Sequence, residues 1–340
     1  MKTEVLIVGG SASWALETYY CKHLNEIGIK TEIFTTANFI NYSIFTKVRS
    51  RLNDISIYKS INTNLIKECF KTKPKIIWIF KGIEIFTETI SFLKQNGFFL
   101  VNYNPDHPYI RTSKSHGGNN IPDSVPLYDL HFSYRKDLVS YFNSTIGIKS
   151  FLLPFGFELD DEDYLKLNSL SEVKKLCFIG TPDRERVNML CSIAKEGFQI
   201  DIYSQTYQDK HKLARFKNIN TFDVVLGQTF WEKIRSYRVQ LNFFRQHNIG
   251  SHNQRTFEVP AAGGILLTPY SEDQDQFFKS ESEIFFYKND AGLLDSIDVI
   301  MSMQDEEINL IRQSARQRST SSNYSYKNRS EFVGSIFKTI

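Results

Sequence analysis

The chain has 340 residues and a formal net charge of +3, with 41% hydrophobic and 23% charged residues. This length is sufficient for two domains, and the balance of residues is that of a soluble globular protein. The small net charge gives no strong field toward nucleic acid or an anionic membrane, so nucleic acid is excluded as the expected partner. No apolar run approaches the ~20 residues that span a bilayer.

The cysteines and the N-terminal segment both bear on the compartment. Four cysteines are scattered in apolar or helical contexts without metal-ligand spacing, at positions 21, 69, 177 and 191. Such cysteines are expected to be buried free thiols in a reducing compartment. The sequence MKTEVLIVGG begins directly with a predicted strand, which leaves no room for a signal peptide. We therefore expect a cytoplasmic protein.

In the first half of the chain, short apolar segments alternate with amphipathic ones. The predicted strands are 4–8, 31–34, 75–80, 98–103, 130–134 and 150–154, and the predicted helices are 13–27, 62–70 and 87–96. This alternation predicts a mostly parallel sheet covered on both faces. The first strand ends at Gly9-Gly10 without the third glycine of a G-x-G-x-x-G pattern, so a hydride-transfer cofactor is disfavoured.

The second half repeats the alternation. The predicted strands are 175–179, 198–203, 239–244, 265–267 and 283–287, with helices at 184–196, 229–237, 272–278, 291–301, 306–318 and 323–340. Two such halves predict an α/β protein with two Rossmann-like, doubly wound domains facing across a cleft. We expect a mobile loop at the polar segment 110–123 and a solvated acidic face at 160–163.

The stretch HNQRTFEVPAAGGILLT, residues 252–268, combines charged and small residues in one short element. Arg255 and Glu258 are three residues apart, so they share one face of a predicted helix. An arginine at a helix start attracts phosphate, and a carboxylate accepts hydrogen bonds from a ribose diol. The alternative interpretation is a surface ion pair followed by a glycine cap at Gly263-Gly264.

This stretch resembles the C-terminal signature of CgeB-like glycosyltransferases, within the group-1 glycosyltransferases of GT-B fold. The pattern R-T-F-E-x-P-A-x-G-G is followed by an apolar strand and by acidic-aromatic residues at 272–278 and 283–286. The likeness is close over residues 248–287. It implies an acceptor-side domain at 1–155, a nucleotide-sugar-binding domain at 156–322, and a C-terminal helix at 323–340 that crosses back to the first domain. It also assigns Glu258 to the ribose hydroxyls.

The residues expected to bind the nucleotide sugar lie at strand ends and helix starts. They are Gly10, Gly180, Thr181, Arg184, Arg186, His252, Asn253, Arg255, Thr256 and Glu258, with Arg245 and His247 as further phosphate partners. Arginines and helix N-termini stabilise the departing nucleoside diphosphate without proton transfer. For each arginine, a surface salt bridge stays open as the alternative.

The stereochemical outcome of transfer is left open by the sequence. Related retaining enzymes carry a second Glu eight residues before the ribose-binding one, where this chain has Gly250. An inverting enzyme needs a base near the acceptor. Our candidates are Asp106 and His107 in the turn NPDHP; an Asx turn with a surface histidine is the alternative. His116 and His131 are weaker candidates.

These observations predict a metal-independent GT-B glycosyltransferase without a cofactor, whose donor is a nucleoside-diphosphate sugar. The pair Asp273-x-Asp275 is interpreted as helix-start acidity rather than a metal site. The acceptor could be a glycan, a lipid-linked saccharide or a protein, and peripheral membrane contact and oligomeric state stay open. The alternatives are a nucleotide-sugar epimerase of the same fold and a non-catalytic nucleotide-sugar-binding module.

Overall fold

The computed structural model describes residues 3–40, 55–110 and 119–340. The chain divides into two compact units. The first unit comprises Met1–Pro154 and Tyr326–Ile340, and the second comprises Phe155–Ser325.

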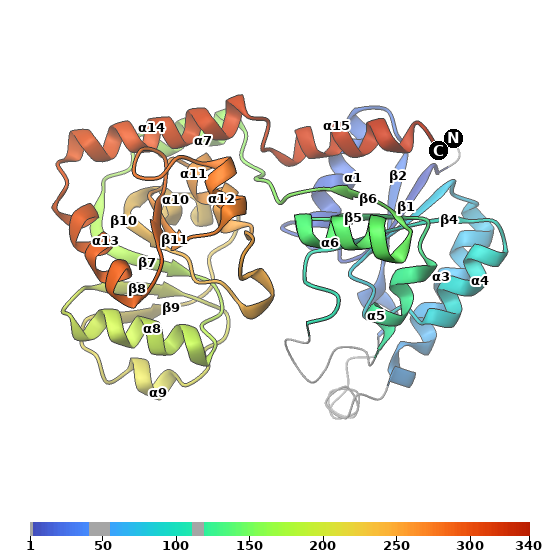
Figure 1. Ribbon diagram of the computed structural model, residues 1–340, viewed down its shortest axis with the longest axis horizontal. Helices are drawn as coiled ribbons and strands as arrows, with labels where there is room; N and C mark the ends of the chain where they lie inside the picture. The colour runs from blue at the N-terminus through green and yellow to red at the C-terminus, as the bar shows by residue number, and fades with distance from the viewer. Residues whose placement is uncertain (1–2, 41–54, 111–118) are drawn as a thin grey trace. The chain divides into compact units, whose positions relative to one another are not determined.

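The first unit is built on a six-stranded parallel sheet with the order β2-β1-β3-β4-β5-β6 (Figure 1). Its strands are β1 (Val5–Gly9), β2 (Thr31–Thr35), β3 (Ile76–Phe80), β4 (Phe99–Asn104), β5 (Leu130–Ser133) and β6 (Lys149–Leu152). Its α-helices are α1 (Leu16–Glu26), α3 (Lys59–Thr72), α4 (Thr87–Gln95), α5 (Asn120–Ser124), α6 (Lys136–Tyr141) and α15 (Tyr326–Phe337). Because β1 and β3 are buried along their whole length, they consist of unbroken apolar runs, as parallel strands covered on both faces must.

The C-terminal helix α15 packs against α1 within this unit. The Tyr326 ring stacks on Tyr19 with centroids 5.0 Å apart, and Phe337 meets Trp78 edge-on at 5.3 Å. Gly334 allows this contact, because a Cβ there would lie 2.5 Å from Ile27 Cδ1. The last segment of the chain therefore completes the aromatic core of the first unit.

The second unit has its own six-stranded parallel sheet, with the order β12-β11-β10-β7-β8-β9. Its strands are β7 (Val173–Ile179), β8 (Ile200–Tyr203), β9 (Ile219–Phe222), β10 (Tyr237–Leu241), β11 (Leu266–Pro269) and β12 (Phe285–Tyr287). Its α-helices are α7 (Asp161–Leu167), α8 (Arg184–Lys195), α9 (Lys210–Leu213), α10 (Gly227–Ser236), α11 (Arg255–Ala261), α12 (Glu272–Phe277), α13 (Asp290–Ser302) and α14 (Asp305–Ser321).

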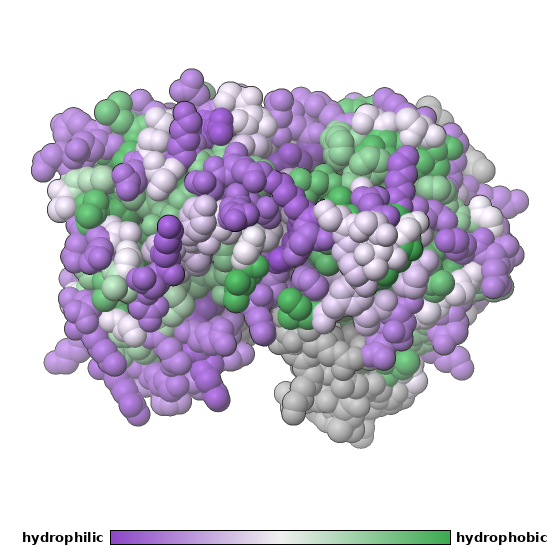
Figure 2. Space-filling view, in the orientation of Figure 1, coloured by the Kyte–Doolittle hydropathy of each residue, from purple (hydrophilic) through white to green (hydrophobic). Residues whose placement is uncertain are grey.

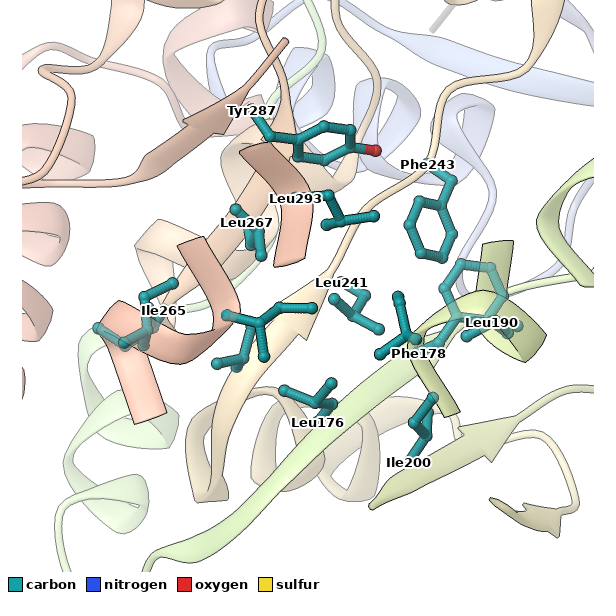
Figure 3. Packing of buried hydrophobic residues seen from close by; sticks show 14 of the residues in the cluster. Leu176, Phe178, Leu190, Ile200, Leu241, Phe243, Ile265, Leu267, Tyr287 and Leu293 are labelled. Carbon is teal, nitrogen blue, oxygen red and sulfur yellow. The ribbon is translucent and has the colours of Figure 1, made fainter. Parts of the chain in front are cut away.

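The core of the second unit joins the central strands to the helices that cover them. Figure 3 shows Leu176 and Phe178 of β7 beside Leu241 of β10 and Leu190 of α8, all of them buried. Phe178 and Phe243 stack with ring centroids 5.4 Å apart at the carboxyl end of the sheet. This packing fixes the ends of β7 and β10, from which the candidate site is built.

Two short elements differ from the sequence prediction. The edge strand β9 was missed, because its residues alternate in burial over only four positions and include two polar side chains. The expected loop 110–123 contains the helix α5, whereas residues 111–118 lie outside the described residues. The acidic run 160–163 is largely exposed, as predicted, and Asp160 also caps α7 by accepting a hydrogen bond from the Asp163 amide.

On the face shown in Figure 2, apolar side chains lie scattered among polar ones. Within the described parts of the chain, no helix has the length and apolar character needed to cross a bilayer.

Candidate functional site

In the second unit, most of the predicted site residues follow the carboxyl ends of β7, β10 and β11. Gly180 follows β7, the segment 242–254 connects β10 to α11, and α12 begins three residues after β11. Ligands of open parallel sheets bind beyond this edge. The topology therefore brings together segments that are up to 90 residues apart in sequence, counting from Gly180 to Tyr270.

Arg255 begins α11 and is held by three kinds of contact. Its guanidinium donates to the Ile179 carbonyl at 3.2 Å, lies over the Phe230 ring at 4.6 Å, and forms an ion pair with Glu258. The ion pair places both side chains on one helix face, and Arg255 is only 25% exposed. Arg255 also donates a hydrogen bond to the last residue of β7. The Arg255–Glu258 ion pair is therefore fixed to the carboxyl end of the sheet and is not an isolated surface pair.

Arg186 connects the two central strands. It donates to the carbonyl oxygens of Thr181 at 3.0 Å and Phe243 at 2.6 Å, and its side chain is 11% exposed. Burial, together with the positive charges of Arg245 and Arg255, lowers the pKa of Arg186 to about 10. Arg186 and Arg245 both lie within ion-pair distance of Asp183. Arg186 and Arg255 both donate to carbonyl oxygens at the end of β7, so the three guanidinium groups gather at this sheet edge.

Two carboxylates face these three arginines. Asp183 lies 3.6 Å from Arg245 and 3.9 Å from Arg186, while Glu258 pairs with Arg255. In the part of the chain that the structure describes, only these two carboxylates lie within ion-pair distance of the three arginines. The five side chains together therefore carry one excess positive charge. An incoming phosphate would receive charge-assisted hydrogen bonds there.

A buried amide and hydroxyl network supports α11 from behind. The Gln274 carbonyl oxygen accepts from Thr256 Oγ1 at 2.8 Å and from Thr268 Oγ1 at 3.3 Å. Asn253 and Asn242 exchange hydrogen bonds through their side-chain amides at 2.9 and 3.2 Å. The structure thus places the Thr256 hydroxyl inside the fold, where it holds α11 against α12. Asn253 bonds to Asn242 and is partly exposed, so its contact with the nucleotide sugar stays a prediction.

His252 is also a packing residue. It is fully buried, and its ring meets those of Phe155, Phe257 and Phe277 at centroid distances of 5.7, 5.4 and 5.1 Å. His247, the other predicted phosphate partner in this connection, is buried as well. Neither histidine presents a surface to a ligand, so the predicted contacts of His252 and His247 are corrected to roles in the fold.

The remaining predicted residues lie at the start of α8 and in the turn before it, and their side chains have different surroundings. Arg184 is 77% exposed and pairs with Asp209 at 3.6 Å, which is the surface salt bridge of the alternative interpretation. Gly180 and Thr181 form the turn after β7, and the Thr181 carbonyl is bonded to Arg186. Thus Arg186, not Arg184, turns toward the arginine group.

The glycines after α11 are explained by packing. A Cβ on Gly264 would lie 2.9 Å from both Ile234 Cγ2 and Val259 Cγ1, and 3.0 Å from the Ile234 carbonyl oxygen. Gly263 has φ +66°, which favours glycine at the helix end. Gly264 therefore allows the backbone to approach α10 closely.

In the first unit, the glycine turn after β1 holds a carboxylate of the chain itself. The Gly10 amide donates to Glu17 Oε1 at 2.9 Å, and a Cβ on Gly9 would lie 2.4 Å from the same oxygen. A phosphate would be repelled by this carboxylate and would find the Gly10 amide already bonded. The Gly10 amide is thus engaged with Glu17 in this structure, and the role of Gly10 in nucleotide-sugar binding stays a prediction.

Asp106 and His107 follow β4 in the predicted turn. The Asp106 amide donates to Asn104 Oδ1 at 3.0 Å, which makes an Asx turn, and the Asp106 carboxylate lies 2.5 Å from Lys81 Nζ. His107 Nδ1 accepts from the Tyr109 amide at 3.2 Å. Both residues lie at the carboxyl edge of the first sheet, with Asp106 neutralised by Lys81.

His131 lies inside the first unit rather than at its edge. One ring nitrogen is 2.9 Å from the Val125 carbonyl oxygen, and burial lowers the pKa of His131 to about 4. A fully enclosed histidine cannot serve as the base, so this candidate is corrected. His116 lies outside the described residues.

The buried neutral His131 should make stability depend on pH. Its folded pKa of about 4 lies below the usual value of about 6.5, so the unfolded chain takes up a proton first as the pH falls. Its contribution is complete above pH ~6.5 and is lost as the pH falls toward 4, by up to about 3 kcal/mol. Urea unfolding should show a smaller loss over this range in His131→Gln; an identical loss in both proteins would contradict this.

The pair Asp273-x-Asp275 belongs to the start of α12. Asp273 accepts a hydrogen bond from Ser251 Oγ at 2.7 Å, and Ser271 caps the helix by accepting from the Gln274 amide. Among the residues described, no cluster of three or more His, Cys, Asp or Glu side chains is arranged to hold a metal ion. Asp273 therefore ties the α11 connection to α12.

Comparison with known proteins agrees with this architecture. Residues 184–334 match a protein family described as glycosyl transferase-like, and no curated protein matches the chain. Sucrose-phosphate synthase from Thermosynechococcus elongatus is similar over 99% of both chains, with a TM-score of 0.72 and 10% identity. The UDP-forming trehalose-phosphate synthase of Burkholderia vietnamiensis is similar over 100% of both chains, with a TM-score of 0.69 and 10% identity.

A third similar structure is the UDP-GlcNAc 2-epimerase of Neisseria meningitidis bound to UDP-GlcNAc, with a TM-score of 0.60 and 10% identity over 99% of this chain and 100% of that one. At such identities the likeness establishes the fold alone, and it confirms the predicted GT-B architecture. The family match covers residues 184–334 and agrees with the resemblance found in the sequence. The chain therefore has the GT-B fold, and its residues 184–334 are similar to a family described as glycosyl transferase-like.

Proposed function

We propose that the protein transfers a sugar from a nucleoside-diphosphate sugar to an acceptor, with the donor bound at the carboxyl edge of the second sheet. The observation that carries this proposal is the group of three arginines, Arg186, Arg245 and Arg255, facing only two described carboxylates. A diphosphate neutralises the excess charge of such a group. Its departure from the sugar is favoured when fixed cations face the charge that develops on it.

The three arginines have different tasks in this proposal. Arg186 already donates hydrogen bonds to two carbonyl oxygens, so it fixes the loops after β7 and β10. Its positive charge attracts the diphosphate without direct contact. Arg245 and Arg255 are 43% and 25% exposed and supply the donors that reach phosphate oxygens. Glu258, on the same helix face as Arg255, accepts hydrogen bonds from the ribose diol.

Several finer assignments belong to the same proposal. The acceptor in this proposal is a glycan, a lipid-linked saccharide or a protein, and Asp106 and His107 are the base candidates predicted from sequence. The four cysteines are free thiols, which favours a reducing compartment such as the cytoplasm. Release of an epimerised nucleotide sugar without transfer would identify the alternative, an epimerase of this fold.

The diphosphate contact is tested by comparing a nucleoside diphosphate with its nucleoside. Arg255→Ala and Arg245→Ala should each weaken diphosphate binding by about 1.5–3 kcal/mol, the range for a hydrogen bond to a charged group, and leave nucleoside binding nearly unchanged. Arg184→Ala is the matched control, because this arginine pairs with Asp209 at the surface. Calorimetric titration that shows equal losses for both ligands, or an equal loss in the control, would remove the assignment.

A further inference from the structure

The strand β9 lies at one end of the second sheet, and among the described residues it pairs with β8 alone (Figure 1). The carbonyl oxygens of Asn218 and Phe222 accept hydrogen bonds from amides of β8 and of the residue after it, at 2.9 and 3.2 Å. The N–H and C=O groups of Thr221, and of the residues two positions before and after it, therefore point away from the sheet. An edge of this kind can accept a further strand.

Apolar side chains are exposed at alternate positions along the end of β9 and the residues after it. Phe222, Val224 and Leu226 are each 42% exposed. The Phe222 ring is held in place by stacking on Tyr203 of β8, with ring centroids 4.9 Å apart. Edge strands of monomeric proteins are usually protected by charged side chains, proline or a covering segment, whereas a row of exposed apolar side chains marks an interaction surface.

Two opposite charges flank β9 at equal distances from its second residue, Asn220. Lys217 lies three residues before Asn220 and Asp223 lies three residues after it, and both are exposed. Within the described parts of the chain, neither has an ion-pair partner. If two copies of β9 pair antiparallel in a register centred on Asn220, Lys217 of each copy lies opposite the partner's Asp223. The charges at this edge are therefore complementary to those of a second copy.

We propose that the chain forms a two-fold symmetric dimer in which β9 pairs antiparallel with β9 of a second copy. In this register the outward N–H of Thr221 donates to the partner's Ile219 carbonyl, and the same bond forms in the other direction. The next register in which outward groups meet places Asp223 opposite the partner's Ile219 and leaves both charges without partners. Because the same edge serves both copies, the contact closes at two chains. The proposal does not depend on the proposed enzymatic function.

The first test measures the mass of the full chain by sedimentation velocity over a wide range of protein concentration. The wild-type chain should change from monomer to dimer as the concentration rises. Thr221→Pro should remain monomeric, because proline removes the outward N–H at the centre of the edge. An edge strand tolerates proline at a position whose N–H faces away from the sheet, so this variant should keep its fold.

The second test exchanges the two charges and does not depend on Thr221→Pro. Asp223→Lys and Lys217→Asp should each raise the dissociation constant of the dimer by about tenfold, because like charges then lie opposite each other twice. An equimolar mixture of the two variants should dimerise again, since every lysine then meets an aspartate in the mixed pair. Asp298→Lys makes the same charge change at an exposed position on α13 and should dimerise as wild type does.

Three results would overturn the proposal. A wild-type chain that is monomeric at every concentration would show that a second copy does not cover this edge. A dimer that Asp223→Lys weakens no more than Asp298→Lys would place the interface elsewhere. A mixture of Asp223→Lys and Lys217→Asp that associates no more tightly than either variant alone would contradict the antiparallel register centred on Asn220.

Discussion

Glu258→Ala should weaken binding of a nucleoside diphosphate by about 1.5–3 kcal/mol, the range for hydrogen bonds to a charged group. The substitution also frees Arg255 from its ion pair, which favours phosphate and works in the opposite direction. A sharper test is therefore the difference in affinity between the ribonucleotide and its 2′-deoxy form. Wild type should prefer the ribonucleotide over its 2′-deoxy form, and Glu258→Ala should lose that preference, because the ribose diol no longer meets a carboxylate.

Glu272→Ala is the matched control for this prediction. Glu272 is a carboxylate in the first turn of the neighbouring helix α12, and it is exposed. We expect it to keep both the affinity and the preference for ribose, measured by calorimetric titration of the two nucleotides. A folded Glu258→Ala protein that still discriminates between them would show that the carboxylate does not bind the sugar diol.

Gly264→Ala should destabilise the second unit by about 1–3 kcal/mol, the range for overpacking a close contact. The added methyl group would meet Ile234 and Val259 at 2.9 Å, so α10 and α11 must move apart or the strand β11 must shift. Because α11 carries Arg255 and Glu258, donor affinity should fall together with stability. Thermal unfolding and nucleotide titration of the same protein measure both effects.

Gly292→Ala provides the comparison for Gly264→Ala. A Cβ on Gly292 would meet only Asn289 Oδ1, at 3.5 Å, and the residue lies in the helix α13. Alanine is favoured over glycine in a helix, so this variant should be as stable as wild type or slightly more stable. A Gly264→Ala protein as stable as Gly292→Ala would show that α10 does not require glycine at position 264.

The sequence predicts the fold well where apolar runs are long and unbroken. The strands β1, β3 and β4 are buried segments bounded by turn residues, and their parallel arrangement follows from the helices between them. The edge strand β9 has four residues and half-buried alternation, so only its pairing with β8 identifies it. Short elements of this kind depend on tertiary contacts more than on local pattern.

The candidate site is less predictable, because the type of a residue does not reveal where its side chain points in the fold. Arg184 and Arg186 are two residues apart on one helix, yet one points to solvent and the other bonds two loops. His252 looks like a ligand in the sequence and is enclosed by aromatic rings. The spacing from Gly9 to Glu17 gave a usable signal that was missed, since a carboxylate in the first helical turn can reach the glycines before it.

The central claim is that the second unit binds a nucleoside diphosphate at the arginine group. The most direct test is calorimetric titration of the wild-type chain with uridine, guanosine and adenosine diphosphates beside the matching nucleosides. We expect at least one diphosphate to bind, and to bind much more tightly than its nucleoside, with that advantage reduced in Arg255→Ala and Arg245→Ala and retained in Arg184→Ala. Absence of binding by every diphosphate, or a nucleoside that binds as tightly as its diphosphate, would contradict the account.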